Sequence, residues 1–314
     1  MFSVIIPLFN KKDFVTRAID SVFTQSFTGF ELIVVDDGST DGGGEFVASK
    51  YGSKLNLIQQ TNKGVSTARN VGINQAMFPW IAFLDADDYW HVNYLEFVSK
   101  VIAVNPVIGM VGTRYSSTEI ESTPILHCFK LDHYFRRAVR NTMYFTSATV
   151  IKKDFFSNNP GFDPQIKLGE DIDLWLRASI FYGDGYYINN TLVYYGQEDA
   201  QKATNKIYPL NETLISKIVK QNYHFSARNR SNFIEKEFLD FRDKWIYFTL
   251  FPHYRLKSNE RPIADTLNSL PGRYFLVRAI YLLPFGLLHR LFATDFFSGW
   301  FRKYMKFCFR FIYT

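Results

Sequence analysis

The chain opens with Ser3-Val4-Ile5-Ile6-Pro7-Leu8-Phe9-Asn10, an apolar run rich in β-branched residues that stops at a polar side chain. Such a run predicts a short buried strand over residues 3–9. Helical and strand-like periods then alternate, with helices expected at 12–25, 44–51 and 65–77 and strands at 31–35, 55–59 and 80–84. This alternation predicts an α/β fold, in which a mostly parallel sheet is covered by helices on both faces.

The rest of the chain separates into two parts. Residues 91–195 keep a mixed pattern, with strands expected at 107–112, 144–151 and 186–195 and a helix at 170–181. From about residue 205 helical periods dominate. A chain of 314 residues can bury one large core or one domain with a smaller appendage. We therefore expect an α/β domain at 1–205 and a helical C-terminal region at 206–314.

Polar clusters follow three of the expected strands. Asn10 comes after the first strand, Asp36-Asp37 after the second and Asp85-Ala86-Asp87-Asp88 after the fourth. Ligands of such sheets bind at the carboxyl ends of the strands. Crowded carboxylates repel one another, and Mg²⁺ or Mn²⁺ held by one or two of them commonly completes its shell with phosphate oxygens. The alternative is a solvated acidic turn that caps the next helix, which is expected to start near His91.

Three further motifs allow more than one interpretation. The loop from Asp37 has the spacing of a calcium loop, but Ala48 stands where the bidentate Glu is required, which excludes it. The Asp37 carboxylate could instead accept a hydrogen bond from a base N–H or a ribose hydroxyl, or Asp37 could belong to an ordinary strand-to-helix turn. Arg69 could meet phosphate or base from its helix, or form a surface ion pair. Glu170 and Asp171 could supply a general base, or stabilise only a helix N-terminus.

Together these motifs resemble those of the inverting glycosyltransferase family 2, which has the GT-A fold. The resemblance runs from Ser3 to about Tyr195. It rests on the motifs Ser3 to Asn10, Val35 to Asp41, Asn62-Lys63-Gly64 to Gly72, Asp85 to Asp88 and Glu170-Asp171 to Arg177. It implies a donor site made of Pro7, Phe9, Asn10, Asp37, Arg69, Asp85, Ala86 and Asp87, with Asp88 and Glu170 in support. Asp87 would be the metal ligand for Mn²⁺ or Mg²⁺, and Asp171 the general base.

The resemblance implies transfer of a sugar from a nucleoside-diphosphate sugar, with a UDP-sugar favoured. The acceptor would be a hydroxyl of a glycan or a lipid-linked saccharide, and the product would have inverted stereochemistry. Processive members often carry a Gln-Xaa-Xaa-Arg-Trp motif and several transmembrane helices. The sequence has neither, so we expect one sugar per event.

Competing interpretations are a nucleotidyltransferase-like enzyme and a non-catalytic nucleotide-sugar-binding protein. A nucleotidyltransferase would normally carry a Gly-rich loop after the first strand, where this chain has Phe9-Asn10-Lys11-Lys12. A dinucleotide oxidoreductase is disfavoured for the same reason. The presence of both Asp87 and Asp171 argues against binding alone, which requires no base.

Positive charge is concentrated in the C-terminal region. Residues 251–314 carry ten Lys/Arg and three Asp/Glu, whereas the first 250 residues have a net charge of −1. This distribution disfavours a nucleic-acid partner and favours an anionic surface, such as a membrane, for the tail. Residues 273–313 interleave aromatic and basic residues, but their longest uncharged piece, 279–288, is too short to span a bilayer. We expect an interfacial amphipathic segment; the alternative is aromatics that pack on the main domain.

Location and acceptor are the least constrained features. The two cysteines suggest no disulfide framework, and no secretory signal precedes the first strand. We therefore expect a cytoplasmic protein that can bind peripherally to the inner face of the cytoplasmic membrane. The loop from Arg114 to Tyr144 should select the acceptor. Its basic run, Arg136-Arg137 with Arg140, could face a lipid-linked diphosphate or be a surface charge run.

Overall fold

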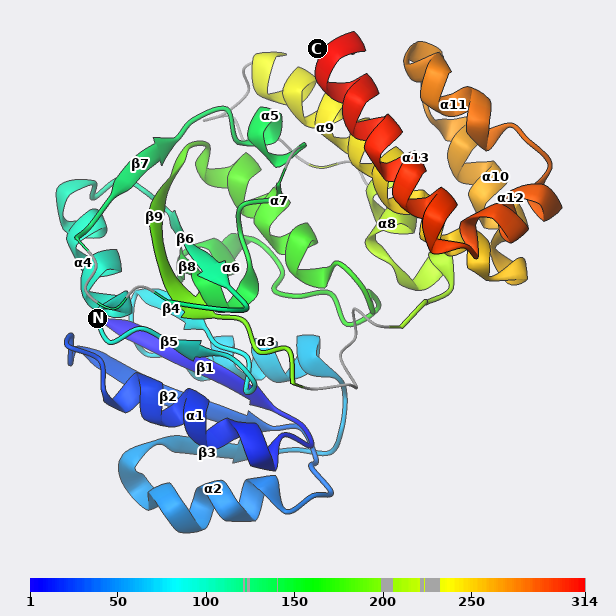
Figure 1. The fold of residues 1–314 in the computed structure, drawn as a ribbon. Helices are drawn as coiled ribbons and strands as arrows, with labels where there is room; N and C mark the ends of the chain where they lie inside the picture. Colours follow the sequence, from blue (N-terminus) through cyan, green and yellow to red (C-terminus); the bar gives the residue numbers. More distant parts are fainter. Residues whose placement is uncertain are drawn as a thin grey trace.

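The computed structural model describes residues 1–120, 122, 125–139, 141–198, 206–220, 223 and 232–313, so Arg140 lies outside the described part. The strands are β1 (Phe2–Leu8), β2 (Phe30–Asp36), β3 (Asn56–Gln59), β4 (Trp80–Phe83), β5 (Tyr89–Trp90), β6 (Met110–Ser116), β7 (Cys128–Leu131), β8 (Thr149–Lys152) and β9 (Gly185–Tyr194). They form one sheet in the order β3-β2-β1-β4-β8-β6-β9-β5, and β7 pairs with β9 (Figure 1).

The helices of the first two thirds are α1 (Lys12–Phe23), α2 (Gly43–Tyr51), α3 (Val65–Gln75), α4 (Tyr94–Val104), α5 (Tyr134–Ala138), α6 (Phe155–Asn158) and α7 (Glu170–Tyr182). The C-terminal helices are α8 (Leu214–Lys220), α9 (Asn232–Leu250), α10 (Glu260–Ser269), α11 (Phe275–Tyr281), α12 (Phe285–Phe292) and α13 (Asp295–Phe307). The α/β fold class and the helical C-terminal region are thus confirmed.

Strand β1 is the centre of the parallel half of the sheet. It pairs in parallel with β2 on one side and with β4 on the other, and β2 pairs in parallel with β3. Antiparallel pairs enter with β8, next to β4. All seven residues of β1 are buried, which explains its unbroken apolar run. Pairing with β4 ends at Ile5–Phe83, so the missing N–H of Pro7 falls beyond the last pair on that side.

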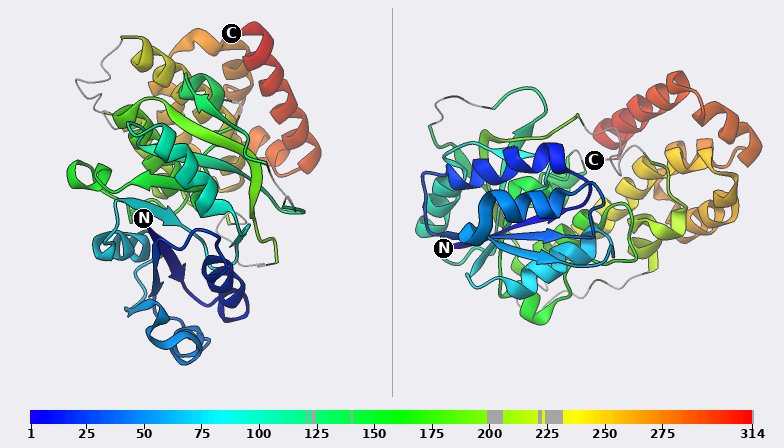
Figure 2. Two further views of the ribbon diagram at one scale, coloured as in Figure 1. Left: turned by 90° about the vertical axis from the view of Figure 1, so that its left-hand side faces the viewer. Right: turned by 90° about the horizontal axis from the view of Figure 1, so that it is seen from below.

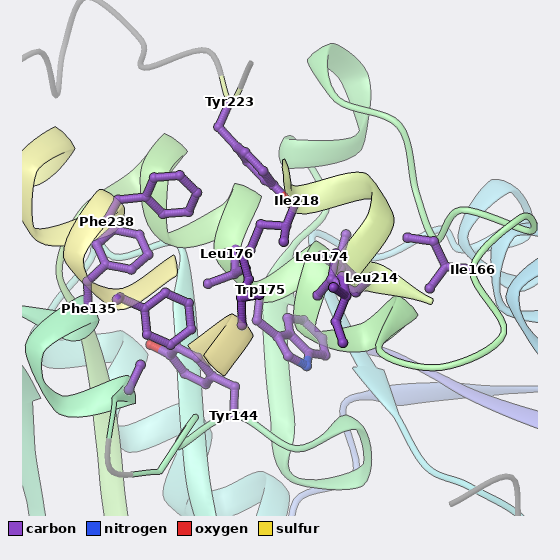
Figure 3. Packing of buried hydrophobic residues seen from close by; sticks show 14 of the residues in the cluster. Phe135, Tyr144, Ile166, Leu174, Trp175, Leu176, Leu214, Ile218, Tyr223 and Phe238 are labelled. Carbon is purple, nitrogen blue, oxygen red and sulfur yellow. The ribbon is translucent and has the colours of Figure 1, made fainter. Parts of the chain in front are cut away.

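Successive side chains along the strands point to opposite faces of the sheet and pack into two hydrophobic cores. Val4 and Ile6 face one side, where they pack with α1, α2 and α4. Ile5 and Phe83 face the other side, where they pack with α3 and α7. This second core continues without a break into the C-terminal helices. Figure 3 shows Leu174, Trp175 and Leu176 of α7 beside residues of α8 and α9.

Many aromatic residues of the C-terminal region are internal. Tyr247, Tyr254, Tyr281 and Phe292 are each at most 3% exposed and contact one another through their rings. Packing therefore accounts for this part of the aromatic composition. Within the described ranges no single helix is long and apolar enough to cross a membrane. The bent pair Gly272–Tyr281 and Phe285–Phe292, at 76°, meets the length and composition criteria.

Three local expectations differ from the structure. The strand expected at 144–151 begins only at Thr149, because Thr146–Ala148 form a 3₁₀ turn. The helix expected to start near His91 begins at Tyr94, after the two-residue strand β5. Strand β6 begins at Met110 rather than 107. The 3₁₀ turn has chemical consequences, because it aims two hydroxyl groups at carboxylates of the site.

Candidate functional site

The loops after β1 and β2 are joined to each other at the carboxyl edge of the sheet. Asn10 has a positive φ of 50°, and its Oδ1 accepts from Thr40 N–H at 2.8 Å. Its own N–H donates to Ser39 Oγ at 3.1 Å. Phe9 is 43% exposed beside it, whereas Pro7 is buried in the strand. Asn10 and Phe9 therefore lie at the surface of this edge, and Pro7 supports them from within.

Asp37 fixes the loop that leads into α3. One carboxylate oxygen accepts from Lys63 N–H at 2.9 Å and from the Gln60 amide at 2.6 Å, and the other accepts from Gly64 N–H at 2.8 Å. The residue is only 2% exposed. Gly38 follows with a φ of 74°, where a Cβ would come within 2.8 Å of Asn62 N. Contact between Asp37 and a base stays a prediction, and the structure adds this positioning role.

Arg69 connects three segments that are distant in sequence. The residue is 4% exposed; its Nη2 lies 2.8 Å from Asp85 Oδ1 and its Nη1 lies 3.0 Å from Glu170 Oε1. The guanidinium also sits 5.0 Å from the ring centre of Phe162. Burial alone would lower the pKa of Arg69, but Asp85 and Glu170 outweigh it and raise that pKa. The structure thus brings Arg69, Asp85 and Glu170 together, as the sequence suggested.

The three carboxylates of the acidic cluster after β4 differ in exposure. Asp87 Oδ2 forms an ion pair with Lys11 Nζ at 2.8 Å, and its side chain stays 12% exposed. Asp88 is 1% exposed and accepts from Ser147 Oγ at 2.5 Å and from Gly196 N–H at 2.9 Å. Burial, reinforced by Asp85, raises the pKa of Asp88 well above its ordinary value. Asp88 is thus the most buried of the three carboxylates, whereas the side chains of Asp85 and Asp87 stay 27% and 12% exposed. Ala86, between Asp85 and Asp87, is buried.

The acidic side chains of the site limit how a divalent cation could bind. Within the described residues no three His, Cys, Asp or Glu side chains converge. An all-protein cage of that size is therefore not formed there. Mg²⁺ commonly binds through one or two carboxylates and completes its shell with water and substrate phosphates. Asp87 fits that mode, with the Lys11 ammonium already occupying a cation position on its Oδ2.

Asp171 is held in a defined orientation at the start of α7. Its Oδ1 accepts from Ile172 N–H at 2.7 Å, and its Oδ2 accepts from Thr146 Oγ1 at 3.1 Å. Burial raises the pKa of Asp171, and the nearby Arg69 charge partly counters that effect. The residue remains partly accessible. A carboxylate that is oriented, reachable and more basic than usual can accept a proton from a bound hydroxyl.

Glu170 should make the stability of the protein depend on pH. Burial, reinforced by Asp171, raises the pKa of Glu170 from 4.5 to about 7, although Arg69 lowers it. The folded protein then binds more protons than the unfolded chain between these values, so stability falls as pH rises through this window. Glu170→Gln removes this titration. As pH rises through this window, the free energy of unfolding of Glu170→Gln should gain on that of wild type by at most about 3 kcal/mol.

Urea denaturation at several pH values measures this change. Glu45→Gln, which alters an exposed glutamate on α2, is the matched control and should follow the wild-type curve. Parallel curves for wild type and Glu170→Gln would contradict the assignment.

Several site residues were missed by sequence reasoning. Lys11 holds Asp87, Thr146 and Ser147 hold Asp171 and Asp88, and Gly196 packs so closely on the Asp87 carbonyl that no larger residue fits. The position of Lys11 just after β1 could have identified it, because β1 and β4 are neighbours. The two hydroxyls gave no signal, since the stretch around them resembles a strand.

The basic run before residue 140 is paired within the protein. Arg136 Nε lies 2.5 Å from Glu237 Oε1, and Arg137 Nη2 lies 2.7 Å from Asp132 Oδ1. Arg136 and Arg137 therefore fit the surface-charge interpretation better than an anionic acceptor. Arg140 lies outside the described residues.

Comparison with known proteins shows which family the first half of the sequence matches. The family model described as Glycosyl transferase family 2 matches residues 3–157. Glycosyltransferase GlyA from Streptococcus pneumoniae serotype 4 is 33% identical over 145 residues, which are 46% of this chain and 21% of that protein. The chain thus matches only about a fifth of that relative's length.

Solved structures share the fold over nearly the whole chain. TarS residues 1–349 from S. aureus, in complex with UDP-GlcNAc, superposes with a TM-score of 0.67 at 19% identity, covering 98% of this chain and 91% of that one. The mannosyltransferase PcManGT from Pyrobaculum calidifontis, in complex with GDP-Man and Mn²⁺, gives 0.54 at 17% identity, covering 97% and 87%. At these identities the likeness shows the GT-A fold alone. By the family match, residues 3–157 of the chain belong to glycosyl transferase family 2.

Proposed function

We propose that the chain is an inverting glycosyltransferase that moves one sugar from a nucleoside-diphosphate sugar, with UDP-sugars favoured, to an acceptor hydroxyl. The observation that carries this proposal is the arrangement of Asp87 and Asp171 around Arg69. Arg69 contacts Asp85, from the loop that bears Asp87, and Glu170, which precedes Asp171. One carboxylate can therefore serve the leaving diphosphate while the other serves the nucleophile.

Asp171 would act as the general base. Thr146 and the Ile172 N–H fix its two oxygens, so one face of the carboxylate is presented in a constant direction. Its raised pKa strengthens proton acceptance from a sugar hydroxyl. Attack of that hydroxyl on the anomeric carbon, opposite the diphosphate, would invert the stereochemistry.

Asp87 and Lys11 would serve the diphosphate. A divalent cation bound at Asp87 would neutralise the charge that develops on the leaving group. The Mn²⁺ in the structure of PcManGT supports this assignment by analogy only. The Lys11 ammonium lies 2.8 Å from the Asp87 carboxylate. When donor is bound, it would turn toward a phosphate oxygen nearby.

The acceptor, location and domain division complete the proposal. We propose a glycan or lipid-linked saccharide as acceptor, a cytoplasmic location and a catalytic domain over residues 1–205. Residues 206–314 would form a helical region that is packed on α7 through the shared core. The uninterrupted core supports treating the two parts as one folding unit in any experiment.

Release of nucleoside diphosphate from a panel of nucleotide sugars tests the function. With Mn²⁺ or Mg²⁺ we expect release from at least one UDP-sugar, and its loss on chelation with EDTA. Asp87→Asn should reduce kcat/KM about 10²-fold or more, because the leaving group loses its metal ligand. Asp184→Asn, which changes a surface carboxylate paired with Lys130, is the matched control and should retain activity.

Two outcomes of this assay would contradict the proposal. Donor binding without release from any donor would favour a nucleotide-sugar-binding protein. Full activity after metal chelation, with Asp87→Asn equal to wild type, would remove Asp87 from the leaving-group role.

A further inference from the structure

Helix α13 and the π-helical turn Cys308–Ile312 form an outer element of the C-terminal region (Figures 1 and 2). One side of this element is internal: Ser298, Phe301, Met305 and Cys308 are buried. Their spacing of three and four residues is that of a helix face that packs on a core. The remaining faces of the element are available to solvent.

An aromatic stripe runs along the outer side of this element. We define it as Phe296, Trp300, Phe307 and Phe311, which are 87%, 46%, 54% and 62% exposed. Steps of four, seven and four residues place these side chains on one side of a helix. The rings of Phe307 and Phe311 lie 5.4 Å apart, so the stripe continues into the π-helical turn. Large exposed apolar side chains gathered on one side of a helix mark an interaction surface.

Cationic side chains accompany the stripe. Arg302, Lys303, Lys306 and Arg310 are all exposed, and residues 296–313 contain no Asp or Glu. Arg302 and Lys306 lie over the rings of Phe251 and Phe248, so part of each cation's stem follows the protein surface. Residues 296–313 therefore present exposed aromatics and four positive charges without an acidic side chain among them. Asp295, the first residue of α13, is exposed and pairs with Arg255.

We propose that this element is a membrane-binding face, which rests on a bilayer that contains anionic lipids. The aromatic stripe would enter the boundary between headgroups and acyl chains, and the four cations would contact lipid phosphates. A second copy of the chain is a poorer occupant, because two surfaces with four positive charges each would repel one another. Membrane binding through this face would not depend on which sugar is transferred.

Co-sedimentation of the full chain with lipid vesicles tests this face. Wild type should bind vesicles of phosphatidylcholine mixed with phosphatidylglycerol and bind pure phosphatidylcholine weakly. The triple variant Phe296→Ser, Trp300→Ser, Phe307→Ser should lose binding at least about tenfold. The variant Lys303→Gln, Lys306→Gln, Arg310→Gln should bind the anionic vesicles about fivefold more weakly for each charge removed. Met77→Ser with Val107→Ser, which changes apolar residues 73% and 92% exposed elsewhere, should bind as wild type does.

Tryptophan fluorescence locates the contact. Trp300 is 46% exposed, whereas Trp80, Trp90 and Trp175 are at most 7% exposed and Trp245 is partly buried against the core. Anionic vesicles should shift the emission to shorter wavelength, and Trp300→Phe should abolish the shift while binding persists. Failure of the wild type to bind anionic vesicles at low salt would overturn the proposal. So would equal binding by the aromatic triple variant and wild type, or a dimer of wild type that this variant dissociates without any vesicle binding.

Discussion

Asp171→Asn is expected to lower kcat for sugar transfer by about 10²–10⁴-fold, the usual contribution of a positioned general base. Asparagine keeps the shape of aspartate and can still accept from the Ile172 N–H, so the start of α7 should be undisturbed. The donor contacts proposed at Asp87 lie on a different loop. We therefore expect donor affinity to change little, and the loss to fall on kcat.

Single-turnover assays with a donor and acceptor, combined with donor titration and thermal unfolding, separate these effects. Asp163→Asn is a suitable control, because Asp163 is an acidic residue seven positions before Glu170 that pairs with Lys217. It should retain wild-type activity. A variant at Asp171 that folds and turns over within about threefold of wild type would exclude this residue as the base.

The edge of the sheet that carries the site could be predicted from the sequence because parallel strands have their carboxyl ends together. Once β1, β2 and β4 are recognised, Asn10, Asp37 and Asp85 must lie at the same edge. Arg69 was also within reach of prediction, because α3 follows β3 at that edge. These inferences need only element order and direction, which periodicity reveals.

The different burial of the carboxylates within the acidic cluster could not be predicted from element order. Which of Asp87 and Asp88 is the more buried depends on Ser147 and Gly196, which hold Asp88 and are 59 and 108 residues away from it. No local pattern encodes such contacts. The same holds for Thr146, whose hydroxyl reaches Asp171 only because a 3₁₀ turn interrupts the expected strand. Local propensity was overridden there by tertiary contacts.

In the C-terminal region, composition was not enough to predict which side chains are buried. Its basic and aromatic composition was clear, but the sequence did not separate aromatics that pack from aromatics that stay exposed. Phe301 and Phe307 are both phenylalanines of α13, yet the first is fully buried and the second 54% exposed. Only the position of each residue on the packed helix decides between the two roles.

Arg69→Met is expected to destabilise the protein by about 3–5 kcal/mol, the range seen when one partner of a buried ion pair is removed. Methionine fills much of the space of the arginine stem, so the loss reports charge rather than a cavity. Asp85 and Glu170 would both lose their cation. Catalysis should also fall, because Arg69 fixes the segment that carries Asp171 relative to the loop that carries Asp87.

The dependence of this loss on pH distinguishes charge from packing. Arg69 lowers the pKa of Glu170, so its removal should raise that pKa further above about 7. Ionisation of Glu170 then costs more, and the destabilisation should be larger at about pH 8 than at about pH 5. Urea denaturation at the two pH values measures it, and Arg69→Met combined with Glu170→Gln should recover part of the loss at the higher pH. Equal losses at both pH values, with no recovery in the double variant, would mean that Arg69 stabilises the protein by packing against Phe162 rather than by neutralising two carboxylates.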